Sequence, residues 1–70
     1  MNWIPVDSSN LARIRYDENT MTLEIEFMGG RVYQYFDVPV QVFEGLRDAG
    51  DSHGKYFNQH IKGHYRYARV

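Results

Sequence analysis

Apolar and polar side chains alternate along three segments of the N-terminal half, which is the pattern of half-buried β-strands. The clearest alternation covers residues 22–27, where one face is apolar and the other is acidic or hydroxylated. Residues 11–16 and 31–36 show the same two-residue period. Between the second and third segments, Gly29 and Gly30 supply the positive φ angles that a tight hairpin turn requires. The pattern predicts an antiparallel meander of three strands.

In the second half, the apolar positions recur every three or four residues, which is the period of a helix packed on one side. The first helix is expected to begin at Pro39, because proline fits the first helical turn, and to end at the left-handed residue Gly50. Asp51 or Ser52 precedes a second helical pattern, which Gly63 closes. The two apolar stripes consist of Val42, Phe43, Leu46 and Ala49, and of Tyr56, Phe57, His60 and Ile61.

The sequence does not decide the inward face of the third strand or the structure of the C-terminal tail. Both faces of the segment 31–36 are partly apolar, and we favour Tyr33 and Tyr35 as the inward pair. Residues 64–70 alternate as well, and this tail either adds an edge strand or wraps across the sheet. The sequence therefore predicts one α+β domain over residues 1–70, with three strands, or four if the tail joins them, and two helices packed on one face.

The composition excludes several classes of protein. Seventy residues permit one domain with a small core, and a chain of this length buries only about 60% of the surface of its unfolded form. The absence of cysteine excludes disulfides, thiolate zinc sites and a cysteine nucleophile, and it suits a reducing compartment. The start of the chain shows no leader pattern, and no apolar run is long enough to span a bilayer. We expect a soluble, cytoplasmic protein without a membrane partner.

The formal charge of −1 conceals a strong segregation. Residues 1–51 contain all nine acids and four of the eight bases, a balance of −5. Residues 52–70 contain the other four bases, no acid and all three histidines, a balance of +4. Such a segregation either draws an acidic sheet and a basic helix together or presents a positive field to a polyanion.

Tyrosines are interleaved with the late cations, and this combination is typical of surfaces that bind single-stranded nucleic acid. Cations contact the phosphates there, while flat side chains stack on the bases. Tyr33, Tyr35 and Phe57 are expected in the core instead, because large aromatics dominate small cores. The candidate nucleic-acid-binding residues are Lys55, Lys62, Tyr65, Arg66, Tyr67 and Arg69.

Three further arginines, Arg13, Arg15 and Arg31, are expected on the open face of the sheet. Glu24 and Glu26 share that face, repel phosphate and can pair with Arg13 or Arg15 on the neighbouring strand. This arrangement weakens a binding mode in which RNA lies flat on the open face.

Seven short segments follow one another along the chain in a characteristic order: Val6-x-Ser8-Ser9, Ile14-x-Tyr16-Asp17, Leu23-x-Ile25-x-Phe27, Gly30, Tyr33-x-Tyr35, Val38-Pro39 and Gly54-x-Tyr56-Phe57-Asn58-x-x-Ile61-x-x-x-Tyr65. Over residues 6–67 this order resembles the KTSC domain family, although the turn at residues 49–54 is longer than is usual there. The family occurs as stand-alone small proteins and at the C-terminus of some lysyl-tRNA synthetases. The resemblance implies the same α+β fold and, from the synthetase context, RNA or tRNA as a partner.

The residues for metal binding and catalysis are present only in part. His60 and His64 stand four apart, but Gly63 lies between them, and a structural zinc site needs four good ligands. Serines, histidines and aspartates are available for hydrolysis, yet no nucleophile-elbow or phosphate-loop motif accompanies them. We expect no metal, no cofactor and no enzymatic activity.

The leading hypothesis is a small non-catalytic module that binds RNA, tRNA or another polyanion through its basic C-terminal helix and tail. The alternative is a protein-interaction or homodimerisation module without a nucleic-acid role. It would use the exposed sheet edge or an apolar patch of Trp3, Met28 and Phe36.

Overall fold

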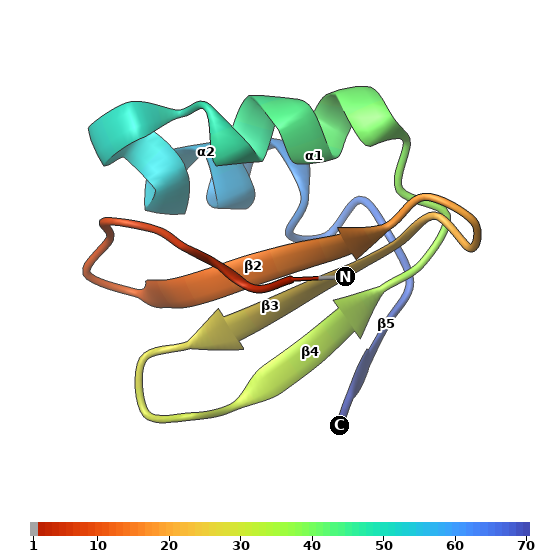
Figure 1. The fold of residues 1–70 in the computed structure, drawn as a ribbon, viewed down its shortest axis with the longest axis horizontal. Helices are drawn as coiled ribbons and strands as arrows, with labels where there is room; N and C mark the ends of the chain where they lie inside the picture. The colour runs from red at the N-terminus through yellow and green to blue at the C-terminus, as the bar shows by residue number, and fades with distance from the viewer. Residues whose placement is uncertain (1) are drawn as a thin grey trace.

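A five-stranded antiparallel sheet in chain order forms one layer of the protein, and two helices cover part of one face of it (Figure 1). The computed structural model describes residues 2–70. The strands are β1 (Ile4–Pro5), β2 (Leu11–Asp17), β3 (Thr22–Phe27), β4 (Val32–Tyr35) and β5 (Tyr67–Arg69). The helices are α1 (Val40–Arg47) and α2 (His53–His60), joined through a 3₁₀ turn (Gly50–Ser52). The predicted α+β fold, with a meander and two helices on one face, is confirmed.

The β3–β4 hairpin forms as the glycine pair predicts. Gly29 and Gly30 have φ angles of 100° and 94°, which side chains with a Cβ rarely adopt. The backbone N–H of Phe27 donates to the carbonyl of Arg31 at 2.8 Å and closes the turn. The pairing of β3 with β4 then continues to Leu23 opposite Tyr35.

The C-terminal tail is a strand. Tyr67 lies opposite Tyr35 and Arg69 opposite Tyr33 in an antiparallel pairing of β5 with β4. At the end of this ladder, the N–H of Val70 donates to the carbonyl of Val32 at 2.9 Å. The tail therefore adds a fourth strand to the predicted meander. The additional strand β1 was not predicted, because two residues are too few to show an alternation.

The core lies between the sheet and the helices and follows the predicted alternation. Tyr35 is only 6% exposed and faces the helices, so the inward assignment of the third predicted strand is confirmed. The side chains that are wholly buried come from both layers: Leu11, Ile14, Leu23, Ile25, Val38, Leu46 and Ile61.

Tyr16 connects β2 to the entry of α1. Its hydroxyl donates a hydrogen bond to the backbone carbonyl of Val38, and its ring stacks on Phe43 with centroids 4.9 Å apart and planes 9° from parallel. Burial, followed by the nearby charges of Glu18 and Asp17, raises the pKa of Tyr16 above its usual 10.0, so the hydroxyl remains a donor at neutral pH. This contact holds the start of α1 against the sheet.

The helix boundaries differ slightly from the predicted ones. Pro39 is the N-cap residue, so α1 begins one residue later than expected. It ends at Arg47 because the chain tightens there, with the N–H of Ala49 bonded to the carbonyl of Leu46. Gly50 adopts the predicted left-handed conformation, with a φ angle of 63°, but it lies in the 3₁₀ turn and not at the end of α1. Gly63, beyond the end of α2, is also left-handed, with a φ angle of 81°.

The two helices approach closely at Gly45 of α1. A Cβ placed on Gly45 would lie 2.1 Å from the Tyr56 hydroxyl oxygen and 2.6 Å from its ring carbon Cζ. Contacts this short do not occur between nonbonded atoms, so a side chain at this position would displace the Tyr56 ring. Glycine is therefore required here by packing and not by its backbone conformation.

We expect Gly45→Ala to lower the free energy of unfolding by about 1–2 kcal/mol, because the overpacking outweighs the roughly 1 kcal/mol that alanine contributes to helix propensity. Urea unfolding measures the change. In a Tyr56→Ala background the same substitution should become neutral or stabilising, and equal destabilisation in both backgrounds would contradict the contact.

Candidate aromatic pocket

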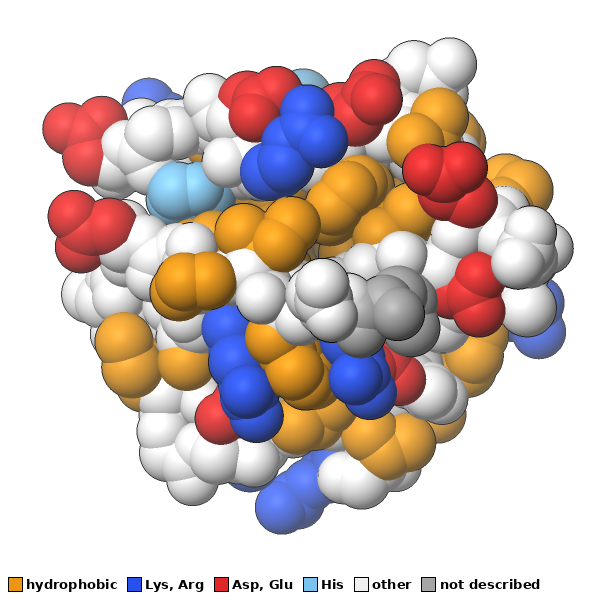
Figure 2. Space-filling model, viewed as in Figure 1, with side chains coloured by type: hydrophobic (Ala, Val, Ile, Leu, Met, Phe, Trp, Pro, Cys, Tyr) orange, Lys and Arg blue, Asp and Glu red, His pale blue; other side chains and the backbone are white. Residues whose placement is uncertain are grey.

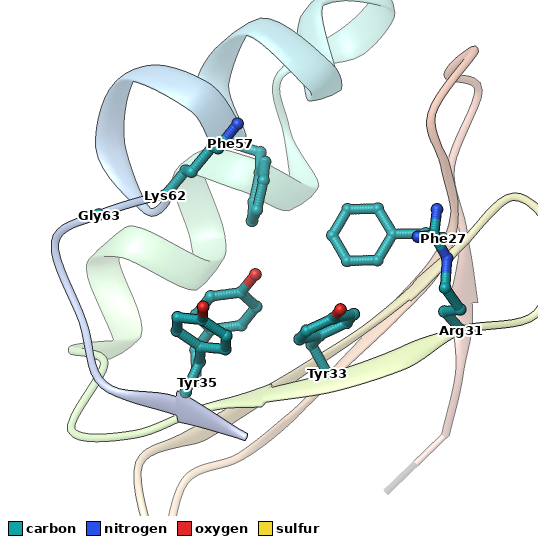
Figure 3. A pocket seen from close by; sticks show the side chains of 8 residues that line it. Phe27, Arg31, Tyr33, Tyr35, Phe57, Lys62 and Gly63 are labelled. Atoms are coloured by element: carbon teal, nitrogen blue, oxygen red, sulfur yellow. The ribbon is translucent and has the colours of Figure 1, made fainter. Parts of the chain in front are cut away.

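The helices leave the helix-side face of β4 and β5 partly uncovered, and a cavity of about 440 Å³ lies there. Figure 3 shows the labelled rings of Phe27, Tyr33, Tyr35 and Phe57 around a common space. Lys62, just beyond the end of α2, and Arg31, in the β3–β4 hairpin, line its edge beside Phe57 and Phe27 (Figure 3). We call this cavity the aromatic pocket; it is lined by Phe27, Arg31, Tyr33, Tyr35, Phe57, Lys62, Gly63 and Tyr67.

The rings hold one another in place. Phe57 packs edge-on against Phe27 and Tyr35, with centroids 5.4 and 5.7 Å apart. Tyr67 lies 5.8 Å from Tyr33 and 5.7 Å from Tyr35. These separations are typical of favourable aromatic pairs, so the walls of the pocket are formed without a ligand. Tyr67 is 61% exposed and so gives solvent access to the cluster.

The charge of the pocket is positive. Its lining, as far as residues 2–70 form it, contains the two cations Arg31 and Lys62 and no carboxylate. Burial, followed by the neighbouring Tyr33 and Tyr67, raises the pKa of Tyr35 to about 12, so its hydroxyl stays neutral and adds no negative charge. The pocket therefore combines flat apolar surfaces with a cationic rim.

The structure brings some of the predicted binding residues together at this pocket and scatters others. Lys62 and Tyr67 line it. Arg69 lies opposite Tyr33 in the strand register, so its Cβ shares the face on which the pocket lies. Lys55 is exposed on α2 and lines a separate hollow nearer the start of that helix.

Tyr65 and Arg66 lie away from the pocket lining. Tyr65 is half-buried and packs against the core. Arg66 donates a hydrogen bond to an Asp37 carboxylate oxygen at 2.8 Å, and its guanidinium lies 5.8 Å from the ring centroid of Phe36. The predicted cluster of four late cations is thus divided.

The ion pairs show whether the late cations are paired with the acidic half of the chain. Of the four late cations, Arg66 alone forms an ion pair within residues 2–70, on Asp37. The sheet carboxylates Glu24 and Glu26 pair with sheet arginines instead. The basic segment is therefore not held to the acidic half by a set of ion pairs.

Arg31 was placed on the wrong face by the sequence analysis. It lines the aromatic pocket on the helix side and does not join Arg13 and Arg15 on the open face. The sequence did contain the information, because residue 31 stands two before Tyr33 and four before Tyr35. In a strand these three positions face the same side of the sheet. Tyr33, Tyr35 and Phe57 pack together as predicted, and they also form the walls of the site.

The opposite face of the sheet is closed by its own side chains. Arg13 pairs with Glu26 and Arg15 with Glu24, as the cross-strand register predicts. Both guanidiniums lie over the ring of Trp3, 4.5 and 4.3 Å from its centroid. On this side the two cations are already partnered, so it offers phosphate little.

The proposed apolar patch of Trp3, Met28 and Phe36 does not form one surface. Trp3 lies against the sheet arginines, as described above. Met28 follows Phe27 at one end of β3, and Phe36 follows Tyr35, which pairs with Leu23 near the other end. Figure 2 shows apolar groups interspersed with charged ones on the face in view.

Residues 2–70 contain no group of three or more histidine, cysteine or acidic side chains placed to hold a metal ion. The ring of His60 lies against Tyr56, with centroids 4.4 Å apart. Within the same residues, neither helix has the length and apolar character that crossing a bilayer requires.

The sequence model of the KTSC domain matches residues 7–65. The chain belongs to the KTSC domain family. The crystal structure of a KTSC domain protein from Yersinia pestis is 33% identical and superposes with a TM-score of 0.89, covering 99% of this chain and 96% of that one.

Relatives of this KTSC domain include both small and large proteins. A protein of Stutzerimonas stutzeri is 42% identical over 100% of this chain and 99% of its own length. A lysine–tRNA ligase of Trichormus variabilis is 42% identical over 91% of this chain. The chain spans only 11% of that ligase, so the same domain occurs both alone and within a much larger enzyme.

Glu24 connects the stability of this KTSC domain to pH. Burial opposes its ionisation, but hydrogen bonds from Gln34 and Arg15 and the charge of Arg15 together hold its pKa below the usual 4.5. A lowered pKa stabilises the fold above the pKa of the unfolded chain, and this contribution is lost as the pH falls.

We expect Glu24→Gln to lower stability at neutral pH and to make the unfolding free energy fall less between about pH 6 and pH 3. Urea unfolding at each pH measures this, with Glu18→Gln in the exposed β2–β3 turn as the matched control. An unchanged pH profile in Glu24→Gln would contradict the role of this carboxylate.

Proposed function

We propose that this KTSC domain is a non-catalytic module that binds single-stranded RNA, with an unpaired base in the aromatic pocket. The supporting observation is the juxtaposition of five aromatic rings with the cations Arg31 and Lys62. Such a site suits a ligand that is flat and apolar in one part and anionic in another. A nucleotide has both parts, because its base stacks on aromatic rings and its phosphate pairs with cations.

The cations Arg31 and Lys62 argue against a cationic ligand, which is the other common ligand of an aromatic cluster. Quaternary and methylated ammonium ligands are held by tyrosine and tryptophan faces through cation–π attraction. Arg31 and Lys62 would repel such a ligand, and no carboxylate among the described lining residues would offset them. The pocket therefore favours an anionic aromatic ligand.

The relatives support RNA as the polyanion. A domain 42% identical to this one is part of a lysine–tRNA ligase, a protein whose name states that it acts on tRNA. A module that contacts single-stranded RNA through stacking and phosphate pairing is compatible with that setting.

We expect Arg31→Gln, Lys62→Gln and Tyr67→Ala each to weaken binding of a labelled single-stranded RNA in fluorescence anisotropy at low salt. Loss of the Tyr67 ring should cost about 1–3 kcal/mol if a base stacks on it. Each cation variant should lower the slope of log affinity against log salt by about 0.7 if the lost cation contacted one phosphate.

Arg66→Gln is the matched control, because it removes the same charge at a position that pairs with Asp37. It should bind nearly as well as the native domain. Equal losses in Arg31→Gln and Arg66→Gln would indicate only diffuse electrostatic attraction, and absent binding in the native domain would refute the proposal.

Self-association is a second candidate, supported by the open edge of β5. Arg66 and Val70 bond to β4, so the backbone N–H and C=O groups of the alternate residues Tyr67 and Arg69 point to the free edge. Such an edge can pair with an extended strand from a second copy.

If this edge pairs, sedimentation velocity should show a dimer that grows with protein concentration. An Arg69→Pro variant removes an N–H of the free edge and should remove the dimer. A native domain that sediments as a monomer at millimolar concentration would exclude self-association through β5.

A further inference from the structure

Two further hollows lie beyond the aromatic pocket along α2. The second hollow, of about 240 Å³, shares Phe27, Arg31, Phe57 and Lys62 with it. The third, of about 520 Å³, shares four residues with the second: Ser9, Asn10, Gly54 and Asn58. Because each hollow shares lining residues with the next, the three lie in a row between α2 and the adjacent loop and hairpin. We call this row of hollows the α2 groove.

The chemistry of the α2 groove changes along its length. The first hollow is aromatic, whereas the last is lined mainly by hydroxyl and amide side chains. The side-chain amides of Asn10 and Asn58 make no hydrogen bond within residues 2–70. These groups can therefore donate to and accept from a ligand without breaking a contact of the fold.

Cations stand at two points of the α2 groove. Arg31 and Lys62 lie where the first and second hollows join, and Lys55 lines the third. Lys55 lies within α2, whereas Lys62 lies two residues beyond the end of that helix, and the two lysines line different hollows. They can therefore address different groups of a bound strand. Asp51 lines the third hollow as well and opposes an anion at that end.

We propose that the α2 groove binds an extended single strand of about three nucleotides, and that Asn58, Asn10 and Lys55 form a second subsite beyond the aromatic pocket. This inference rests on the proposed function. One base occupies the aromatic pocket, and its phosphate lies at Arg31 and Lys62. The polar edge of the next base meets the amides of Asn10 and Asn58, and the following phosphate approaches Lys55.

The test is a length series of 5′-phosphorylated uridylates with one, two, three and six nucleotides, titrated into the full chain by calorimetry. We expect the affinity to rise from the mononucleotide to the trinucleotide and to increase little per site beyond that length. If the affinity does not rise beyond that of the mononucleotide, the second subsite is overturned.

Variants separate the two parts of the groove. Asn58→Ala should weaken trinucleotide binding by roughly two- to tenfold, the range for one hydrogen bond, and should leave the mononucleotide unaffected. Lys55→Gln should act in the same direction, and Asp51→Asn should strengthen trinucleotide binding. Asn19→Ala, in the exposed β2–β3 turn away from the groove, is the control for the amide substitution.

The two proposals fail in distinguishable ways. If no uridylate binds, the proposed function fails and the second subsite fails with it. A different result refutes the second subsite alone. In that case uridylates bind and Tyr67→Ala weakens their binding, but Asn58→Ala, Lys55→Gln and Asp51→Asn leave the trinucleotide affinity unchanged. The aromatic pocket would then still be supported.

Discussion

The two helices cover only part of one face of the sheet, and the exposed aromatic surface follows from that constraint (Figure 1). The helix-side face carries large apolar side chains across its width, from Ile14 on β2 to Tyr67 on β5. Tyr35 is 6% exposed and its neighbour Tyr67 is 61% exposed, so the helical cover ends between these two strands. The aromatic pocket is thus the open margin of the core.

This origin explains how the pocket can be both rigid and accessible. Phe57 and Tyr35 are buried and belong to the core, and their rings also contact the exposed or half-buried rings of Phe27 and Tyr67. A ligand that enters the pocket meets side chains already held by the fold, so little conformational entropy is lost there on binding. The close contact of Gly45 with Tyr56 sets how α1 and α2 pack together, and α2 contributes Phe57 and Lys62 to the pocket.

The segregated charges are used differently on the two faces of the sheet. On the open face, Arg13 and Arg15 pair with glutamates and lie over Trp3, which leaves that surface locally neutral. On the helix side, Arg31 and Lys62 border an aromatic surface without a carboxylate among the described lining residues. The overall charge of −1 therefore does not describe the surface that a polyanion would meet.

The sequence alone determined the meander, both helices and the inward faces of the first two predicted strands, because the direction of a side chain follows from the local backbone period. Both faces of residues 31–36 are partly apolar, and packing of Tyr35 against Phe57 decided which of them is inward. The sequence did not reveal the two-residue strand β1, whose pairing is decided by β2. It also grouped Lys55, Lys62, Arg66 and Arg69, which are close together in the chain. In the tertiary structure Arg66 pairs with Asp37, and Arg31 lines the same pocket as Lys62. Which cations share a site depends on where the helices end over the sheet, and that is set by packing between residues far apart in the chain.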